Sequence, residues 1–117
     1  MGLSTHVLDT MIGAPASGMA VAFYTTSGGI AKLVKQFALN SDGRNPDGLL
    51  YDNASLKVGT YRLVFDVAAY FKAQGVALPV PNFLNAVTID FGVPDAGAYY
   101  HVPLLVSPWS YSTYRGS

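Results

Sequence analysis

Two histidines, His6 and His101, are the side chains of this 117-residue sequence best suited to moving a proton near neutral pH. Each falls in a stretch that we expect to be a strand, which would hold its ring rigidly. A catalytic pair is one interpretation, and the other is two half-buried strand residues with no chemical task. Two histidines without a nearby cysteine or an HExxH helix fall short of the three or four ligands that zinc takes, so we expect no metal.

Arg44 is a third candidate, because a planar and permanently charged guanidinium can hold an anion or a carbonyl oxygen. It stands in the turn Asp42-Gly43-Arg44 and could equally be a solvated loop charge. Chain ends usually carry little information, yet residues 108–117 include three large aromatic side chains. We therefore expect this tail to dock, either in a cleft or at the end of a sheet.

The overall composition excludes several classes of protein. Seven basic residues balance seven acidic ones, so no positive field favours nucleic acid or an anionic membrane. The absence of cysteine excludes disulfides, thiolate zinc sites and cysteine nucleophiles. No apolar run approaches the roughly 20 residues of a membrane span, and the first residues lack a basic segment followed by an apolar one. We expect a cytoplasmic protein, although a cleaved export signal would leave a similar chain.

The proportion of apolar residues is high for a small protein. Half of the residues are hydrophobic and 12% are charged, which leaves little polar material to cover a monomer. We expect residues 1–117 to form a single domain and to bury apolar surface between subunits.

Short apolar stretches separated by Gly, Pro, Asn and Asp predict an all-β sandwich or barrel. One helix is expected at residues 67–74, with Asp66 as its N-cap and Gly75 at its end. The expected strands are 3–9, 19–25, 30–37, 60–65, 86–91, 99–106 and 111–115.

The predicted strand at 99–106 has no polar face. Tyr100 and the alternate residues after it form one apolar face, and the other face is formed by Tyr99, His101, Pro103 and Leu105. A sheet with one face in water should alternate apolar with polar residues. The second face is therefore expected to meet another subunit or to form the wall of a site.

Five segments, spread from one end of the chain to the other, match the sequence pattern of a known family. They are Leu3-Ser4-Thr5-His6-Val7-Leu8-Asp9-Thr10 with Gly13-Ala14-Pro15-Ala16 after it, Asp42-Gly43-Arg44, Gly59-Thr60-Tyr61-Arg62-Leu63, Tyr100-His101-Val102-Pro103-Leu104-Leu105 and Tyr114-Arg115-Gly116-Ser117. Together they resemble the 5-hydroxyisourate hydrolases, a family of transthyretin-related enzymes. The terminal tetrapeptide is the most specific, because transthyretin hormone carriers share the fold and lack both it and this histidine pair. The chain departs from the pattern at residues 30–36, which lack an expected tryptophan, and at 78–83.

The resemblance implies a transthyretin-like sandwich of two sheets, with about eight strands and one short helix. It also implies a homotetramer with active clefts along its central channel, and no cofactor. The implied reaction, in urate (purine) catabolism, hydrolyses a cyclic amide of 5-hydroxyisourate to give 2-oxo-4-hydroxy-4-carboxy-5-ureidoimidazoline. The implied catalytic residues are His6, Arg44, His101 and Ser117, and the implied substrate-binding residues are His6, Arg44, Tyr114, Arg115 and Gly116.

Amide hydrolysis needs a deprotonated water, a stabilised oxyanion and a protonated leaving nitrogen. We expect His6 and His101 to deprotonate the water and return the proton, and Arg44 to stabilise charge on the attacked carbonyl. Ser117 would complete the proton relay, and which histidine is the base stays open. The alternatives are a non-enzymatic carrier of a small aromatic ligand in the intersubunit channel, and a structural sandwich module without a site.

Overall fold

The computed structural model describes residues 2–116, which form nine strands and one helix. The predicted two-sheet sandwich with one short helix is confirmed. The strands are β1 (Gly2–Asp9), β2 (Ala14–Pro15), β3 (Ala20–Ser27), β4 (Ile30–Ala38), β5 (Tyr51–Asp52), β6 (Gly59–Phe65), β7 (Val87–Val93), β8 (Tyr100–Val106) and β9 (Tyr111–Thr113), and the helix is α1 (Val67–Ala73).

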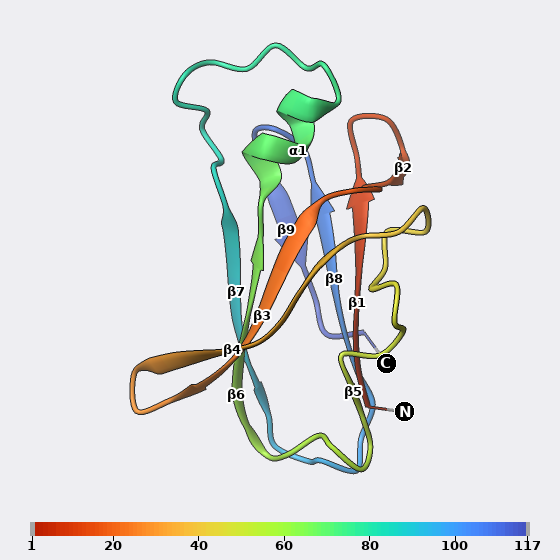
Figure 1. Ribbon diagram of the computed structural model, residues 1–117, viewed down its shortest axis with the longest axis vertical. Coiled ribbons are helices and arrows are strands. Elements are labelled where there is room, and N and C mark those ends of the chain that lie inside the picture. The colour runs from red at the N-terminus through yellow and green to blue at the C-terminus, as the bar shows by residue number, and fades with distance from the viewer. Residues whose placement is uncertain (1, 117) are drawn as a thin grey trace.

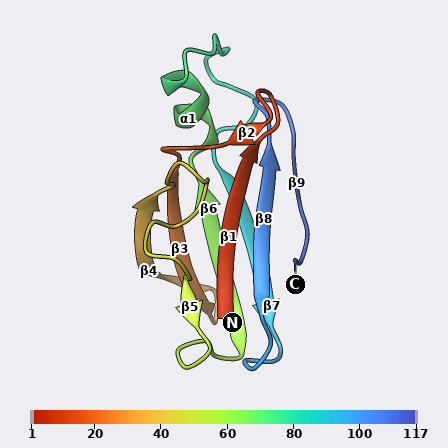
Figure 2. The ribbon, with the colours of Figure 1, turned by 90° about the vertical axis from the view of Figure 1, so that its right-hand side faces the viewer.

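The strands build two sheets that pack face to face (Figures 1 and 2). One sheet has the order β2-β1-β8-β9, with β5 also paired to β1, and the other has the order β4-β3-β6-β7. The pair β1–β8 is parallel, with Leu3 opposite Tyr100 and Asp9 opposite Val106. Strands from the two ends of the chain therefore lie side by side at the centre of one sheet.

The core lies between the sheets, and alternate residues of β3 and β6 point into it. Val21 and Phe23 of β3 are buried, as are Leu63 and Phe65 of β6. Each such side chain contributes roughly 1.5–3 kcal/mol when it is fully removed from water. The Tyr61 ring stacks on Phe23 with ring centroids 5.8 Å apart. Both strands belong to the four-stranded sheet, so these side chains form its side of the core.

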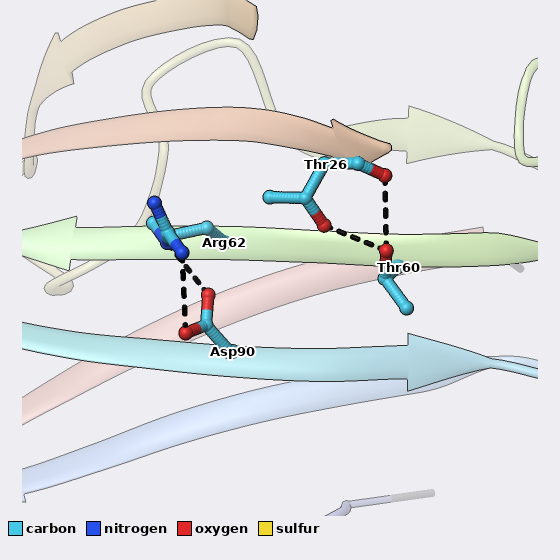
Figure 3. A network of polar contacts seen from close by, with 4 residues as sticks. All are labelled: Thr26, Thr60, Arg62 and Asp90. Carbon is cyan, nitrogen blue, oxygen red and sulfur yellow. Dashed lines mark hydrogen bonds and ion pairs between the residues drawn. The ribbon is translucent and has the colours of Figure 1, made fainter. Parts of the chain in front are cut away.

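Polar pairs link neighbouring strands on the outward face of the four-stranded sheet (Figure 3). Arg62 Nε lies 2.6 Å from Asp90 Oδ1 across β6 and β7. Thr26 and Thr60 join β3 to β6 through hydroxyl oxygens 2.6 Å apart. Such exposed pairs contribute little to stability, because water and salt screen them.

The helix α1 begins directly after Asp66, as predicted, but the Asp66 side chain makes no capping hydrogen bond. The helix is held instead by packing of Tyr70 and Phe71 into the core, and the Tyr70 hydroxyl donates to Asp9 Oδ2 at 2.8 Å. Gly75 follows the helix with φ +84°, as the predicted stop requires. No helix among residues 2–116 is long and apolar enough to cross a membrane.

Two of the strands are too short to be predicted from a pattern. Ala14–Pro15 lies in a stretch expected to be a loop, but it pairs with Leu8 and Asp9 of β1. Tyr51–Asp52 pairs in the same way with the first residues of β1. The strand predicted at 111–115 ends at Thr113. All three differences lie at the edges of the five-stranded sheet and leave its central pair unchanged.

Candidate active site

The parallel β1–β8 pair brings the two histidines to one face of the five-stranded sheet. Ser4 is opposite His101 and His6 is opposite Pro103, so both rings lie on the face that points away from the core. Their ring centroids are 6.4 Å apart and their planes are inclined by 31°. One small substrate can touch both rings at this separation.

The loop that follows β4 carries Arg44 to the same place, because its backbone is joined to β1. The backbones of His6 and Arg44 form an isolated antiparallel β-bridge, and the Val7 amide donates to the Gly43 carbonyl at 3.0 Å. Gly43 has φ +72°, and a β-carbon there would lie 2.5 Å from the Val7 carbonyl oxygen. Asn40 Oδ1 accepts from the amide of Arg44 at 3.0 Å. The predicted grouping of His6, Arg44 and His101 in space is thus present.

The surroundings favour neutral histidines. Partial burial and the neighbouring Arg44 charge lower the pKa of His6, although the Asp42 backbone and carboxylate act in the opposite direction. Burial, Arg44 and His6 lower the pKa of His101. Since the ordinary histidine pKa is about 6.5, both rings are uncharged at pH 7 and can act as bases or as hydrogen-bond donors.

The tail reaches the site at Gly116. Its amide donates to the His101 carbonyl at 2.7 Å, and the His101 amide donates back at 3.2 Å. This bridge continues the β8–β9 register, in which Leu104 is opposite Thr113. A β-carbon at Gly116 would lie 3.0 Å from Cδ2 of the His101 ring, so any larger residue there would press on the ring. The remaining predicted tail residue, Ser117, lies outside the described residues.

Tyr114 and Arg115 occupy different positions from Gly116. The Arg115 guanidinium lies 4.7 Å above the Tyr100 ring and donates from Nη2 to the Tyr99 carbonyl at 3.2 Å. These contacts attach the tail to the end of β8 and do not involve either histidine. Tyr114 is exposed. Within one subunit, the structure does not bring these two side chains to the histidine pair.

Two hydroxyls beside His101 were not predicted from the sequence. Ser4 Oγ lies 2.7 Å from His101 Nδ1 and is also hydrogen-bonded to the Tyr99 hydroxyl. The Tyr99 ring stacks on His101 with ring centroids 6.5 Å apart. Ser4 stands two positions before His6, and Tyr99 stands two positions before His101, so each shares a strand face with that histidine. That spacing is the sequence signal that could have identified them.

A hollow of about 350 Å³ is lined in part by Arg44 and by Ser4 and Tyr99, the two residues that contact His101. A larger hollow of about 690 Å³ lies between the β7 edge and the tail, where Phe91 and Tyr114 contribute to its wall. Neither histidine lines either hollow, but Arg44 and the neighbours of His101 line only the smaller one, so the chemistry favours it as the substrate site. No group of three or more potential metal ligands occurs in the described part of the chain.

The fold and this site define a transthyretin-like β-sandwich with two histidines and an arginine on one outer sheet face. The family model described as HIUase/Transthyretin family matches residues 3–116, and the chain belongs to that family. A 5-hydroxyisourate hydrolase of Ralstonia nicotianae is 51% identical over 115 residues, which cover 98% of this chain and 97% of that relative.

Two solved structures share the fold over nearly the whole chain. An (S)-allantoin synthase matches with a TM-score of 0.92 at 42% identity over 99% of this chain, which spans 43% of that protein's length. Sea bream transthyretin in complex with thyroxine matches with a TM-score of 0.83 at 26% identity over 99% of this chain and 95% of its own. An enzyme and a protein solved with thyroxine thus share this backbone.

Proposed function

We propose that this protein hydrolyses 5-hydroxyisourate to 2-oxo-4-hydroxy-4-carboxy-5-ureidoimidazoline in urate catabolism. The observation that carries the proposal is the pair of imidazole rings, with centroids 6.4 Å apart, and Arg44 close enough to lower the pKa of both. The relative that is 51% identical over nearly its full length bears the name of this activity. Geometry and kinship therefore support the same reaction.

The chemistry follows from what each group can do. A neutral imidazole takes a proton from water as the oxygen attacks the cyclic amide, and the proton returns to the leaving nitrogen when the C–N bond breaks. Arg44 binds substrate oxygens and stabilises the negative charge that develops on the attacked carbonyl. We assign Ser117 to the proton relay and Tyr114, Arg115 and Gly116 to substrate contacts, in keeping with the family resemblance.

A non-enzymatic carrier is the competing function, and backbone similarity does not exclude it, because sea bream transthyretin has the same fold. The site decides between them. A carrier of an aromatic ligand needs an apolar wall, and it does not require two histidines beside an arginine. The names of the relatives, which are 5-hydroxyisourate hydrolases, independently favour the hydrolase.

We also propose that residues 1–117 act as one domain and that four copies assemble into a homotetramer. The candidate site lies on the outer face of a sheet, so another subunit is needed to enclose it. Exclusion of water strengthens every electrostatic contact in such a site.

An ultraviolet assay tests the function directly. The purified protein should accelerate the loss of freshly generated 5-hydroxyisourate, both without added metal and in the presence of a chelator. A folded protein that leaves the spontaneous decay unchanged would contradict the proposal. Saturable binding of an aromatic ligand by that inactive protein would favour the carrier instead.

A further inference from the structure

Three side chains form a hydrogen-bonded chain that ends on the candidate site. Tyr99 Oη contacts Ser4 Oγ, and Ser4 Oγ lies 2.7 Å from His101 Nδ1. Ser4 is 6% exposed, which keeps water from replacing either contact. Because Nδ1 is occupied in this way, Nε2 is the nitrogen of His101 that can meet a substrate.

The direction of this chain follows from the acidity of its members. A phenol, with a pKa near 10, is a stronger hydrogen-bond donor and a weaker acceptor than an aliphatic alcohol. Tyr99 therefore donates to Ser4, and the single Ser4 proton goes on to His101 Nδ1. A ring that accepts at Nδ1 while uncharged carries its proton on Nε2.

His6 has different surroundings. The backbone and carboxylate of Asp42 lie near its ring and act to raise its pKa, against burial and Arg44, so they favour a ring that has taken up a proton. A neutral imidazole has one nitrogen with a free lone pair, which can take that proton. The charged and titratable groups that face His101 are Arg44 from the loop and His6 from β1, with Tyr99 stacked on its ring.

We propose that Ser4 and Tyr99 are positioning residues that fix neutral His101 with its proton on Nε2, which makes His101 a hydrogen-bond donor and leaves His6 as the base. This assignment rests on the proposed hydrolysis. His6 takes a proton from water while the water oxygen bonds to the carbonyl carbon. His101 Nε2–H donates to the carbonyl oxygen without losing its proton. When the C–N bond breaks, the proton held by His6 moves to the leaving nitrogen, and both rings return to their initial state.

The direction of one pKa change tests this hydrogen-bonded series of side chains without any substrate. The His101 pKa should be measured by NMR titration in the wild type and in Ser4→Ala, Ser4→Thr and Tyr99→Phe. Loss of a donor to the neutral ring should raise the His101 pKa by roughly 0.5 to 1 in Ser4→Ala, and by less in Tyr99→Phe. Ser4→Thr keeps the hydroxyl and should resemble the wild type.

An unchanged or lowered His101 pKa in Ser4→Ala would overturn the proposal. A lowered value would mean that His101 Nδ1 donates its proton to Ser4, a contact that stabilises the charged ring. The His6 resonance in the same spectra is the internal reference. Tyr99→Phe keeps the stacked ring, so it provides a second test if Ser4→Ala does not fold.

A kinetic measurement separates positioning from simple packing. Ser4→Ala should lower kcat by roughly tenfold with little change in KM, because the Nε2 contact strengthens in the transition state. Normal turnover beside a raised pKa would overturn the positioning role. Since the titration uses no substrate, failure of the hydrolase assay and failure of the hydroxyl chain are independent results.

Discussion

His6, Arg44 and His101 reach one face from three separate segments of the sequence, and each has a different task in the proposed reaction. Replacing any of them by alanine should reduce kcat/KM on the order of 10²-fold or more, the scale of acid–base and oxyanion groups. Initial rates by the ultraviolet assay give the measurement.

Arg62→Ala is the matched control for Arg44→Ala. Arg62 is also an arginine in an exposed position, but its ion pair with Asp90 lies on the outer face of the other sheet. Its loss should leave the rate unchanged. Equal losses in the two arginine variants would point to a general charge effect and remove Arg44 from the mechanism.

The low pKa of each histidine also makes a prediction about pH. Both are lowered by burial first and by Arg44 second, so in the folded protein they bind protons at lower pH than in the unfolded chain. As pH falls below the unfolded value of about 6.5, the unfolded chain takes up protons first, and the free energy of unfolding decreases. Activity should be constant near pH 7 and should fall on the acid side of 6.5. Thermal melting and kcat/KM between pH 5 and pH 8 measure the two effects. Activity that increases as the pH is lowered from 6.5 to 5 would contradict neutral histidines.

Gly116 allows a test of how closely the tail approaches the site. Alanine there would press a methyl group against the His101 ring, since the β-carbon position lies 3.0 Å from Cδ2. Gly116→Ala should lower kcat several-fold or more with little loss of stability, because the tail lies at the end of the fold. Gly92→Ala is the control, because a β-carbon at Gly92 meets nothing within 4 Å. Identical rates in both variants would show that the tail need not touch His101.

The sequence predicts the histidines, the arginine and the tail as site residues because their types are rare or their motifs specific. It did not identify Ser4 and Tyr99, since serine and tyrosine are common and their role depends on the register of two distant strands. That Ser4 is opposite His101 is a property of the β1–β8 pairing. No local pattern contains it.

Among the elements, the alternating strands and the single helix were predictable from periodicity and from Asp66 and Gly75. The parallel pairing of β1 with β8 was not, because period-two alternation identifies a strand's faces and not its neighbour. β2 and β5 have two residues each, which is too few to give a pattern. Both are held in place by β1.

The loop after β4 has one position on which its placement depends. Gly43→Ala would put a β-carbon 2.5 Å from the Val7 carbonyl at φ +72°, which must displace the loop and Arg44 with it. We expect a loss of at least about 1 kcal/mol in unfolding free energy and a marked loss of rate. Urea unfolding and initial rates measure the two effects.

Gly28→Ala separates backbone strain from displacement of Arg44. Gly28 also has a positive φ, +56°, but a β-carbon there meets nothing within 4 Å. This variant should lose some stability and keep its activity. If Gly43→Ala also kept full activity, the loop geometry would be irrelevant to catalysis.

For the whole molecule, the two outer faces differ in kind. The four-stranded sheet presents threonines and an ion pair to water (Figure 3). The five-stranded sheet presents the histidines together with Leu105, all three only partly buried. At the end of the same sheet, Met11 and Trp109 line a common hollow and are 55% and 58% exposed. Apolar surface of this kind on a small protein is usually covered by a partner.

We therefore expect the active form to be a homotetramer with self-complementary interfaces, in which a second copy covers this surface. Light scattering should give four times the mass of the chain. Trp109 is the sequence's single tryptophan, so its emission reports on its own surroundings. On dilution to the point of dissociation, the emission should shift to longer wavelength as the indole meets water, and the rate per subunit should fall with it, because the site loses the neighbour that encloses it. A stable monomer with full activity would contradict the assembly and the enclosed cleft together.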